Sequence, residues 1–324
     1  MDTQNAQNER KNQQTEKQVY RMKRRDKILL GVILGTIGAL FVLAICAVVG
    51  IHLYFHQPGN TYYYKGGRFA NGAEYAQYTK LVVKKGVKSI PDNLFSACDS
   101  ALSVSIPDSV TSIGETAFYG CQRLSEITIP DSVTEIGEYA FQECEGATKI
   151  TLSKNLKTIS PGLCFACTSL SDVTIPAGVV EIGDHAFNHC HELTEIALPA
   201  SVTRIGEYAF YYCTGLTSVT LNEGLVEIDK RAFSACTSLT AVVIPDGVTV
   251  VGAYAFRNTG LSSVSLPASL SSLNKSTFAE CAALREITYR GTVAEWNAIE
   301  KDADWMLGSP IETIRCVDGT ITIE

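Results

Sequence analysis

A 23-residue repeat is the feature that most restricts how this chain can fold. Phenylalanines fall on one grid with this spacing: Phe95, Phe118, Phe141, Phe187, Phe210, Phe233 and Phe256. Cys164 takes the one vacant position, and Phe278 arrives one residue early. Cysteines keep the same grid three residues later: Cys98, Cys121, Cys144, Cys167, Cys190, Cys213 and Cys236. The next cysteine position is lost where the chain shortens at 256–261, and Cys281 resumes the column. Such self-similarity is typical of solenoids, in which each repeat is one coil stacked on the next.

One coil reads LSEITIPDSVTEIGEYAFQEC over residues 124–144. Its ITI alternation predicts a half-buried strand, which Pro130 ends because proline lacks an N–H for the ladder. VTEI predicts a second short strand, Gly137 permits a tight corner, and EYAF predicts a short helical turn that points its Phe and Cys inward. About nine coils occupy residues 81–286. The predicted core contains Phe118, Cys121, Phe141, Cys144, Phe187, Cys190, Phe210, Cys213, Phe233 and Cys236.

The pattern IxIPxxVxxIGxxAFxxCxxL, present as ITIPDSVTEIGEYAFQECEGA and ALPASVTRIGEYAFYYCTGL, resembles the BspA-type leucine-rich repeat family over about residues 81–290. The segment 289–296 is similar to the closing segment of such arrays. The resemblance implies a mainly β leucine-rich-repeat solenoid of parallel stacked coils with short helical turns. The resemblance also implies that the chain is a surface protein without catalysis of its own. Proteins of this family include adhesins that bind host matrix proteins or other cells.

An apolar segment without any charge runs from Ile28 to Ile51. As a helix it is long enough to cross a hydrocarbon core of about 30 Å, so we expect one transmembrane α-helix before the solenoid. Arg21, Lys23, Arg24, Arg25 and Lys27 adjoin one end, which predicts a cytoplasmic N-terminus and an extracellular solenoid. Two alternatives are a cleaved signal peptide, whose apolar region is normally shorter, and lipidation at Cys46, where Ile45 occupies a position that requires a small residue.

The charge distribution excludes nucleic acid as a partner. Residues 1–27 contain eight Lys or Arg and four Asp or Glu, a net charge of +4. The remainder contains nineteen Lys or Arg and thirty Asp or Glu, a net charge of −11. Phosphate binding needs clustered Lys and Arg, which an acidic body lacks.

Eleven cysteines outside a membrane would ordinarily indicate a disulfide framework. Here eight share one repeat column, and stacked coils hold their Cβ vectors parallel, which is poor geometry for a bridge. We therefore expect small buried thiols. The spacing of Cys164 and Cys167 leaves a redox pair as the alternative, although Cys164 replaces a core phenylalanine.

His185, His189 and His191 surround Cys190, and this cluster is the one candidate for a metal site. The repeat explains each residue without a metal, because His185 shares a column with Tyr139 and Tyr208 and the other two fall at variable surface positions. We predict no metal and no cofactor. No nucleophile, base and acid stand apart from the repeat columns, so no catalytic residue is predicted and the chain is not expected to be an enzyme.

Two exposed columns of the first strand are the candidate binding residues. They comprise Glu126, Thr128, Lys149, Thr151, Asp172, Thr174, Glu195 and Thr220. The hydroxyl column indicates either ordinary β propensity on a solvated sheet or a flat face that binds an extended partner through many shallow contacts. The sequence identifies neither the binding face nor the ligand.

The predicted organisation is a cytoplasmic tail at 1–27, a transmembrane helix at 28–54, a stalk and N-terminal cap at 55–80, the solenoid at 81–290 and a C-terminal cap at 291–324. In the cap, Thr292 to Glu295 predicts a capping box, and the strand pair around Asp318-Gly319 predicts a hairpin. The predicted function is membrane-anchored binding of an extracellular protein or cell-surface ligand, in adhesion or recognition. The alternatives are the ectodomain of a signalling receptor and a surface scaffold.

Overall fold

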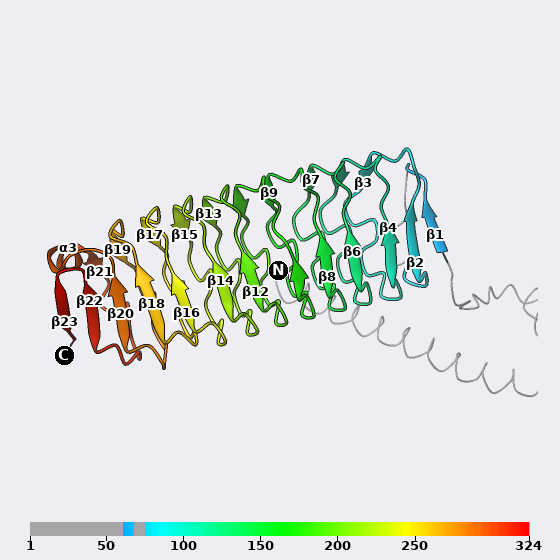
Figure 1. Cartoon of the computed structure of the whole chain (residues 1–324). Helices are drawn as coiled ribbons and strands as arrows, with labels where there is room; N and C mark the ends of the chain where they lie inside the picture. The colour runs from blue at the N-terminus through cyan, green and yellow to red at the C-terminus, as the bar shows by residue number, and fades with distance from the viewer. Residues whose placement is uncertain (1–60, 68–74, 324) are drawn as a thin grey trace, which may run out of the picture. The chain divides into compact units, whose positions relative to one another are not determined.

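The described part of the chain is a parallel β-solenoid. The structure is a computed structural model that describes residues 61–67 and 75–323. The predicted span Ile28–Ile51 and the tail 1–27 lie outside these ranges. Within the described ranges, no helix is both long enough and apolar enough to cross a bilayer. Each coil places one strand in each of two rows that run along the solenoid (Figure 1).

The first row consists of strands of two to four residues that pair in parallel. Its members are β1 (Thr61–Tyr64), β2 (Lys80–Val83), β4 (Ser103–Ser105), β6 (Glu126–Thr128), β8 (Lys149–Thr151), β10 (Asp172–Val173), β12 (Glu195–Ala197), β14 (Ser218–Thr220), β16 (Ala241–Val243), β18 (Ser263–Leu266), β20 (Glu286–Tyr289) and β22 (Thr313–Cys316). The register is one repeat, so that Ile127 lies opposite Ile150. Because side chains alternate along a strand, the row buries its aliphatic column and exposes the residues on either side.

The second row is made of two-residue strands, also parallel. Its members are β3 (Ser89–Ile90), β5 (Ser112–Ile113), β7 (Glu135–Ile136), β9 (Thr158–Ile159), β11 (Glu181–Ile182), β13 (Arg204–Ile205), β15 (Glu227–Ile228), β17 (Val250–Val251), β19 (Ser272–Leu273) and β21 (Glu300–Lys301). The second residue of the strand points into the core; Ile182, for example, pairs with Ile159 and Ile205 and is fully buried.

The predicted short helical turns do not form. Residues 138–143 are turns, and their alternate N–H groups donate to the next coil: Tyr139 N to Pro161 O at 2.9 Å and Phe141 N to Leu163 O at 3.0 Å. Tyr139 and Glu143 adopt left-handed backbone with φ of 55° and 57°, which interrupts any helix. The helical prediction was wrong because the N–H groups of Tyr139 and Phe141 donate to the next coil, and the bonds along the chain, such as Gln142 N to Tyr139 O at 3.1 Å, close single turns only. We call this third side of the solenoid, between the second strand of one coil and the first strand of the next, the turn face.

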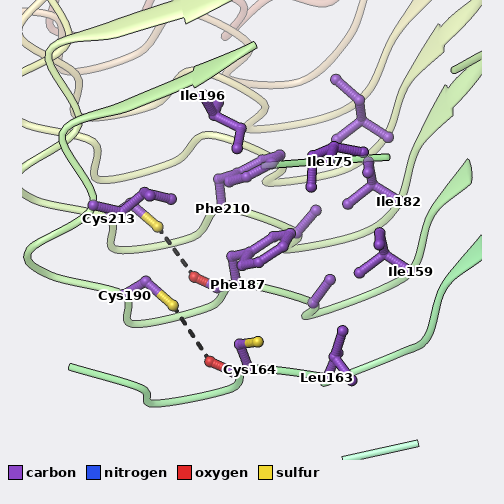
Figure 2. Packing of buried hydrophobic residues seen from close by; sticks show 14 of the residues in the cluster. Ile159, Leu163, Cys164, Ile175, Ile182, Phe187, Cys190, Ile196, Phe210 and Cys213 are labelled. Atoms are coloured by element: carbon purple, nitrogen blue, oxygen red, sulfur yellow. Dashed lines mark hydrogen bonds between the residues drawn. The ribbon is translucent and has the colours of Figure 1, made fainter. Parts of the chain in front are cut away.

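The core contains a stack of phenylalanine rings that is interrupted at one coil, where Cys164 takes the ring position. Phe187 and Phe210 lie 5.4 Å apart between ring centroids with planes 9° apart (Figure 2). Phe210 and Phe233 lie 5.2 Å apart with planes 4° apart. Each phenylalanine of the column is fully buried. Large aromatic rings bury much apolar area, and near-parallel packing lets identical coils repeat without a gap.

The column cysteines are buried thiols that hydrogen-bond between coils. Cys190 donates its S–H to Cys164 O at 3.3 Å, and Cys213 donates to Phe187 O at 3.1 Å (Figure 2). Where the column loses its cysteine, Thr259 occupies the position, and its hydroxyl donates to Phe256 O at 2.9 Å. The position therefore selects a small side chain with a donor, which either residue supplies.

The C-terminal end is closed by a cap. Within the described residues, the only α-helix is α3 (Val293–Ala298), which begins with the predicted capping box between Thr292 and Glu295. The predicted hairpin is also confirmed, since β23 (Gly319–Thr322) pairs antiparallel with β22. Trp305 ends the ring stack edge-on against Phe278, with centroids 6.4 Å apart. An antiparallel last strand and an edge-on tryptophan cover what would otherwise be open sheet and core.

Candidate binding surfaces

The first row presents an exposed polar face that contains every candidate binding residue predicted from the sequence. All eight are exposed: Glu126, Thr128, Lys149, Thr151, Asp172, Thr174, Glu195 and Thr220. The register sets Lys149 between Glu126 and Asp172 on adjacent strands, and its ammonium lies 2.5 Å from the Asp172 carboxylate. The hydrogen bond and charge of Asp172 raise the pKa of Lys149. We call this surface the strand face.

Two neighbouring hydroxyl columns on this side have different roles. Hydroxyls just before the strands bond inside the solenoid: Thr148 donates to Ser125 O at 3.2 Å and Thr217 to Thr194 O at 2.9 Å. Within the described part of the chain, by contrast, the hydroxyls of Thr128, Thr151 and Thr174 contact no hydrogen-bond partner. The second column is therefore available to a partner, whereas the first is part of the scaffold.

The second row carries a charged cluster centred on Arg204. Its guanidinium lies 2.5 Å from Glu181, 3.5 Å from Asp184 and 3.7 Å from Glu227, and it also contacts Asp229. The four carboxylates come from adjacent coils, so Arg204 joins three coils at once. One cation among four anions leaves the neighbourhood with a net negative charge.

The turn face carries a surface of aromatic side chains that sequence reasoning missed. It comprises Tyr139, Phe165, His185, His189, Tyr208, Tyr211 and Tyr212. His185 stacks on Tyr208 at 4.8 Å between centroids with planes 9° apart, and His189 stacks on Tyr212 at 5.0 Å. Tyr212 is 42% exposed and the others are partly exposed. We call this set the aromatic surface.

The aromatic surface has a signal in the sequence that appears only when coils are overlaid. Its residues occupy three separate repeat columns, and each column holds non-aromatic residues in other coils. The rings become neighbours because consecutive coils stack directly over one another. Searching for aromatic residues that coincide in adjacent coils, outside the phenylalanine column, would have found it.

The three histidines of the metal alternative belong to ring stacks. His189 and His191 lie 5.6 Å apart between centroids and both contact Tyr212. Across residues 61–67 and 75–323, no three His, Cys, Asp or Glu side chains converge as metal ligands would. Burial lowers the pKa of His185, against the opposing effect of Asp184 and Glu207, so the ring is neutral at pH 7.

The residues predicted to form the repeat core lie in the interior. Each of the predicted phenylalanines and cysteines, from Phe118 to Cys236, is fully buried. Burial raises the pKa of Cys213 to about 12 and also raises those of Cys144, Cys190 and Cys236. Cys164 and Cys167 are both fully buried as well, and the hydrogen bond with Cys167, together with burial, raises the pKa of Cys164. A thiolate is the reactive form of cysteine, so this environment favours packing over redox chemistry.

The model of the BspA type leucine rich repeat region matches residues 73–193 and 180–299, in six copies. The chain belongs to the BspA-type leucine-rich repeat family. The family explains the repeat, the parallel rows and the solenoid, and it is typical of proteins that bind other proteins.

Solved structures of leucine-rich repeat proteins resemble this chain. A leucine rich cell surface protein from Faecalibacterium prausnitzii A2-165 is 32% identical, over 72% of this chain and 65% of that one, with a TM-score of 0.49. A leucine-rich repeat protein from Eubacterium ventriosum ATCC 27560 is 22% identical, over 78% of this chain and 90% of that one, with a TM-score of 0.46. The chain thus spans just under two thirds of the first protein's length. No protein with curated annotation matches the chain.

Proposed function

We propose that this chain is a membrane-anchored surface protein that binds an extracellular protein or cell-surface ligand through the strand face, in adhesion or recognition, without catalysis of its own. The observation that carries the binding proposal is the Thr128, Thr151 and Thr174 column, whose hydroxyls are exposed and unused by the solenoid. Parallel coils repeat these donors at one-strand spacing, roughly 4.8 Å, which suits an extended partner.

The anchoring part of the proposal has sequence support. The uncharged segment Ile28–Ile51 is long enough to span a bilayer, and five basic residues precede it between Arg21 and Lys27. In this arrangement residues 1–27 face the cytoplasm and the solenoid faces outward. The Faecalibacterium prausnitzii protein is described as a cell surface protein, which agrees with this placement.

Topology is tested first, by protease treatment of intact and lysed cells that produce the chain. Cleavage after Ile51 in intact cells is the expected result. Protection in intact cells would contradict the proposed orientation. The shed solenoid is then applied to an array of matrix proteins and glycans, where saturable binding that tolerates salt is expected.

The strand face is tested on the partner that this array identifies. Thr151→Lys combined with Thr174→Lys places bulky cations on the exposed column and should reduce affinity at least about tenfold. Thr158→Lys is the matched control, because Thr158 is equally exposed but lies in the second row. Equal loss in both variants would contradict the strand face as the contact surface. Surface exposure without binding to any array member would favour the receptor or scaffold alternatives.

A further inference from the structure

We propose that the aromatic surface on the turn face is a second docking site, which takes arginine side chains from a basic segment of a partner protein. The site is distinct from the strand face, since it is built from a different side of the coil. It therefore goes beyond the proposed function and does not depend on membrane anchoring.

The solenoid itself shows how this side accepts a guanidinium. Arg231 occupies the column of Tyr208 and Tyr254 and lies over both rings, 5.4 Å and 4.9 Å from their centroids. Its Nη1 also donates to the Tyr208 hydroxyl at 3.0 Å. An arginine stacked between two aromatic rings gains cation–π attraction while its edges stay available for hydrogen bonds. The rings of His185 and Tyr208 already stack on each other, so a partner arginine would lie instead over the exposed ring of Tyr212.

The turn segments of the neighbouring coils carry rings and acids but no cation of their own, although two of the acids, Asp184 and Glu207, contact Arg204 and Lys230 from outside these segments. The turn segments 138–145, 161–168, 184–192 and 207–214 contain six acidic residues and no Lys or Arg. The acids are Glu138, Glu143, Glu145, Asp184, Glu192 and Glu207. Lys230, from the next coil, lies 3.7 Å from Glu207 and 5.8 Å from the centre of the Tyr208 ring, so the surface of the solenoid already pairs a cation with an acid and a ring at one edge of the site. Charge complementarity favours a basic partner.

The fold does not require aromatic residues at the outermost positions. His189 and Tyr212 share a column with Ala97, Ala166 and Ala235, all of which adopt left-handed backbone with φ between 56° and 62°. A small side chain is therefore sufficient for the turn. A ring at this position instead exposes apolar area to solvent. Tyr212 is 42% exposed and lies beside the His189 ring of the coil below. Tyrosine and arginine are the residues most enriched at the energetic centres of protein interfaces.

The proposal is tested with the full chain in a nonionic detergent and three labelled peptides. Each peptide alternates four identical residues with glycine, and that residue is arginine, lysine or the neutral isostere citrulline. Fluorescence anisotropy should rank arginine first, lysine about fivefold weaker because an ammonium does not stack on rings as a guanidinium does, and citrulline without measurable binding.

Two variants locate the site without disturbing the fold. His189→Ala combined with Tyr212→Ala gives two coils the residue that Ala166 and Ala235 supply elsewhere, and should weaken the arginine peptide about tenfold. Tyr63→Ala is the matched control: Tyr63 is 48% exposed, and Lys84 already lies 4.1 Å over its ring. This control should bind the peptide as the parent does.

Several outcomes would overturn the proposal. Unchanged affinity in the double alanine variant is one, and equal affinity for the arginine and lysine peptides is another, since both would indicate only general attraction to an acidic protein. Binding of a neutral oligosaccharide, maltohexaose, that the double variant abolishes would assign the rings to a glycan instead. Thr151→Lys should leave peptide binding unchanged, which separates failure here from failure of the strand-face proposal.

Discussion

Leu163 and Cys164 exchange the side-chain sizes that most coils place at the same two positions. Six coils carry alanine followed by phenylalanine: Ala117, Ala140, Ala186, Ala209, Ala232 and Ala255 each precede a column ring. In the remaining interior coil the large residue comes first and the small one second, and both are fully buried (Figure 2). The core thus keeps its volume across the break in the ring stack.

This exchange predicts strong coupling between the two positions. Cys164→Phe alone overfills the core and should destabilise by about 1–3 kcal/mol, and Leu163→Ala alone leaves a cavity and should cost about 2–5 kcal/mol. The double variant restores the common pair and should be closer in stability to the parent than either single one. Urea unfolding of the four proteins measures the coupling. Additive losses would show that the two side chains do not compensate each other.

Gly137 is predicted to tolerate no side chain. A Cβ at this position would lie 2.3 Å from Glu115 N in the coil below, and backbone cannot move aside as the end of a side chain can. Gly137→Ala should therefore lower the free energy of unfolding by about 1–3 kcal/mol. Gly178→Ala is the control, since the nearest atom to its Cβ is the Lys157 ammonium nitrogen at 3.3 Å. A loss as large for Gly178 as for Gly137 would rule out coil contact as the cause.

The column thiols are predicted to be unreactive in the folded protein. Burial raises the pKa of Cys213 to about 12 and also raises those of Cys190 and Cys236, so almost no thiolate exists at pH 8. Brief treatment with N-ethylmaleimide, followed by peptide mass spectrometry, should label the partly exposed Cys316 first. Labelling of the column should need denaturant. Rapid native labelling of Cys213 would contradict the buried column.

Stability is predicted to fall as the histidines of the aromatic surface become protonated. Burial lowers the folded-state pKa of His185, opposed by Asp184 and Glu207, and burial together with His191 lowers that of His189. Protons then bind the unfolded chain more readily, so this stabilisation is complete above the unfolded pKa of about 6.5 and declines as pH falls below it.

Unfolding midpoints between pH 7.5 and pH 5.5 measure this effect, in a range where most carboxylates stay charged. The variant His185→Gln with His189→Gln should show a flatter dependence than the parent. A parent that gains stability on acidification through this range would contradict the expected sign.

The repeat columns were sufficient to predict the solenoid because burial on one side of each strand recurs at the same position of every coil. The conformation of the turn was not predictable in this way. Tyr139 N donates to Pro161 O, in the next coil. Helix propensity depends only on residues that are close in sequence, so it does not predict such a bond. The first row also extends beyond the repeat range, to β1 and β22, because these segments pair with the array without carrying its motif.

The candidate sites were predictable to different degrees. Residues on the strand face follow from period-two alternation, so Thr151 and Thr174 were correctly expected to be exposed. The contact between His185 and Tyr208 was not expected, since the shared column was taken as evidence of a structural role alone. Residues one repeat apart are distant in sequence, and only stacking makes their rings a surface.

The parallel register of one repeat has a consequence for inheritance. The backbone hydrogen bonds of each interior coil run to the coils directly before and after it, and Ile182 pairs with Ile159 and Ile205 in the same way that other coils pair. Recombination that removes or duplicates a block of 23 residues therefore preserves the parallel backbone pairing of the remaining coils and leaves the C-terminal cap in place. The length of the solenoid can therefore change by one whole coil at a time during evolution, and the fold stays the same.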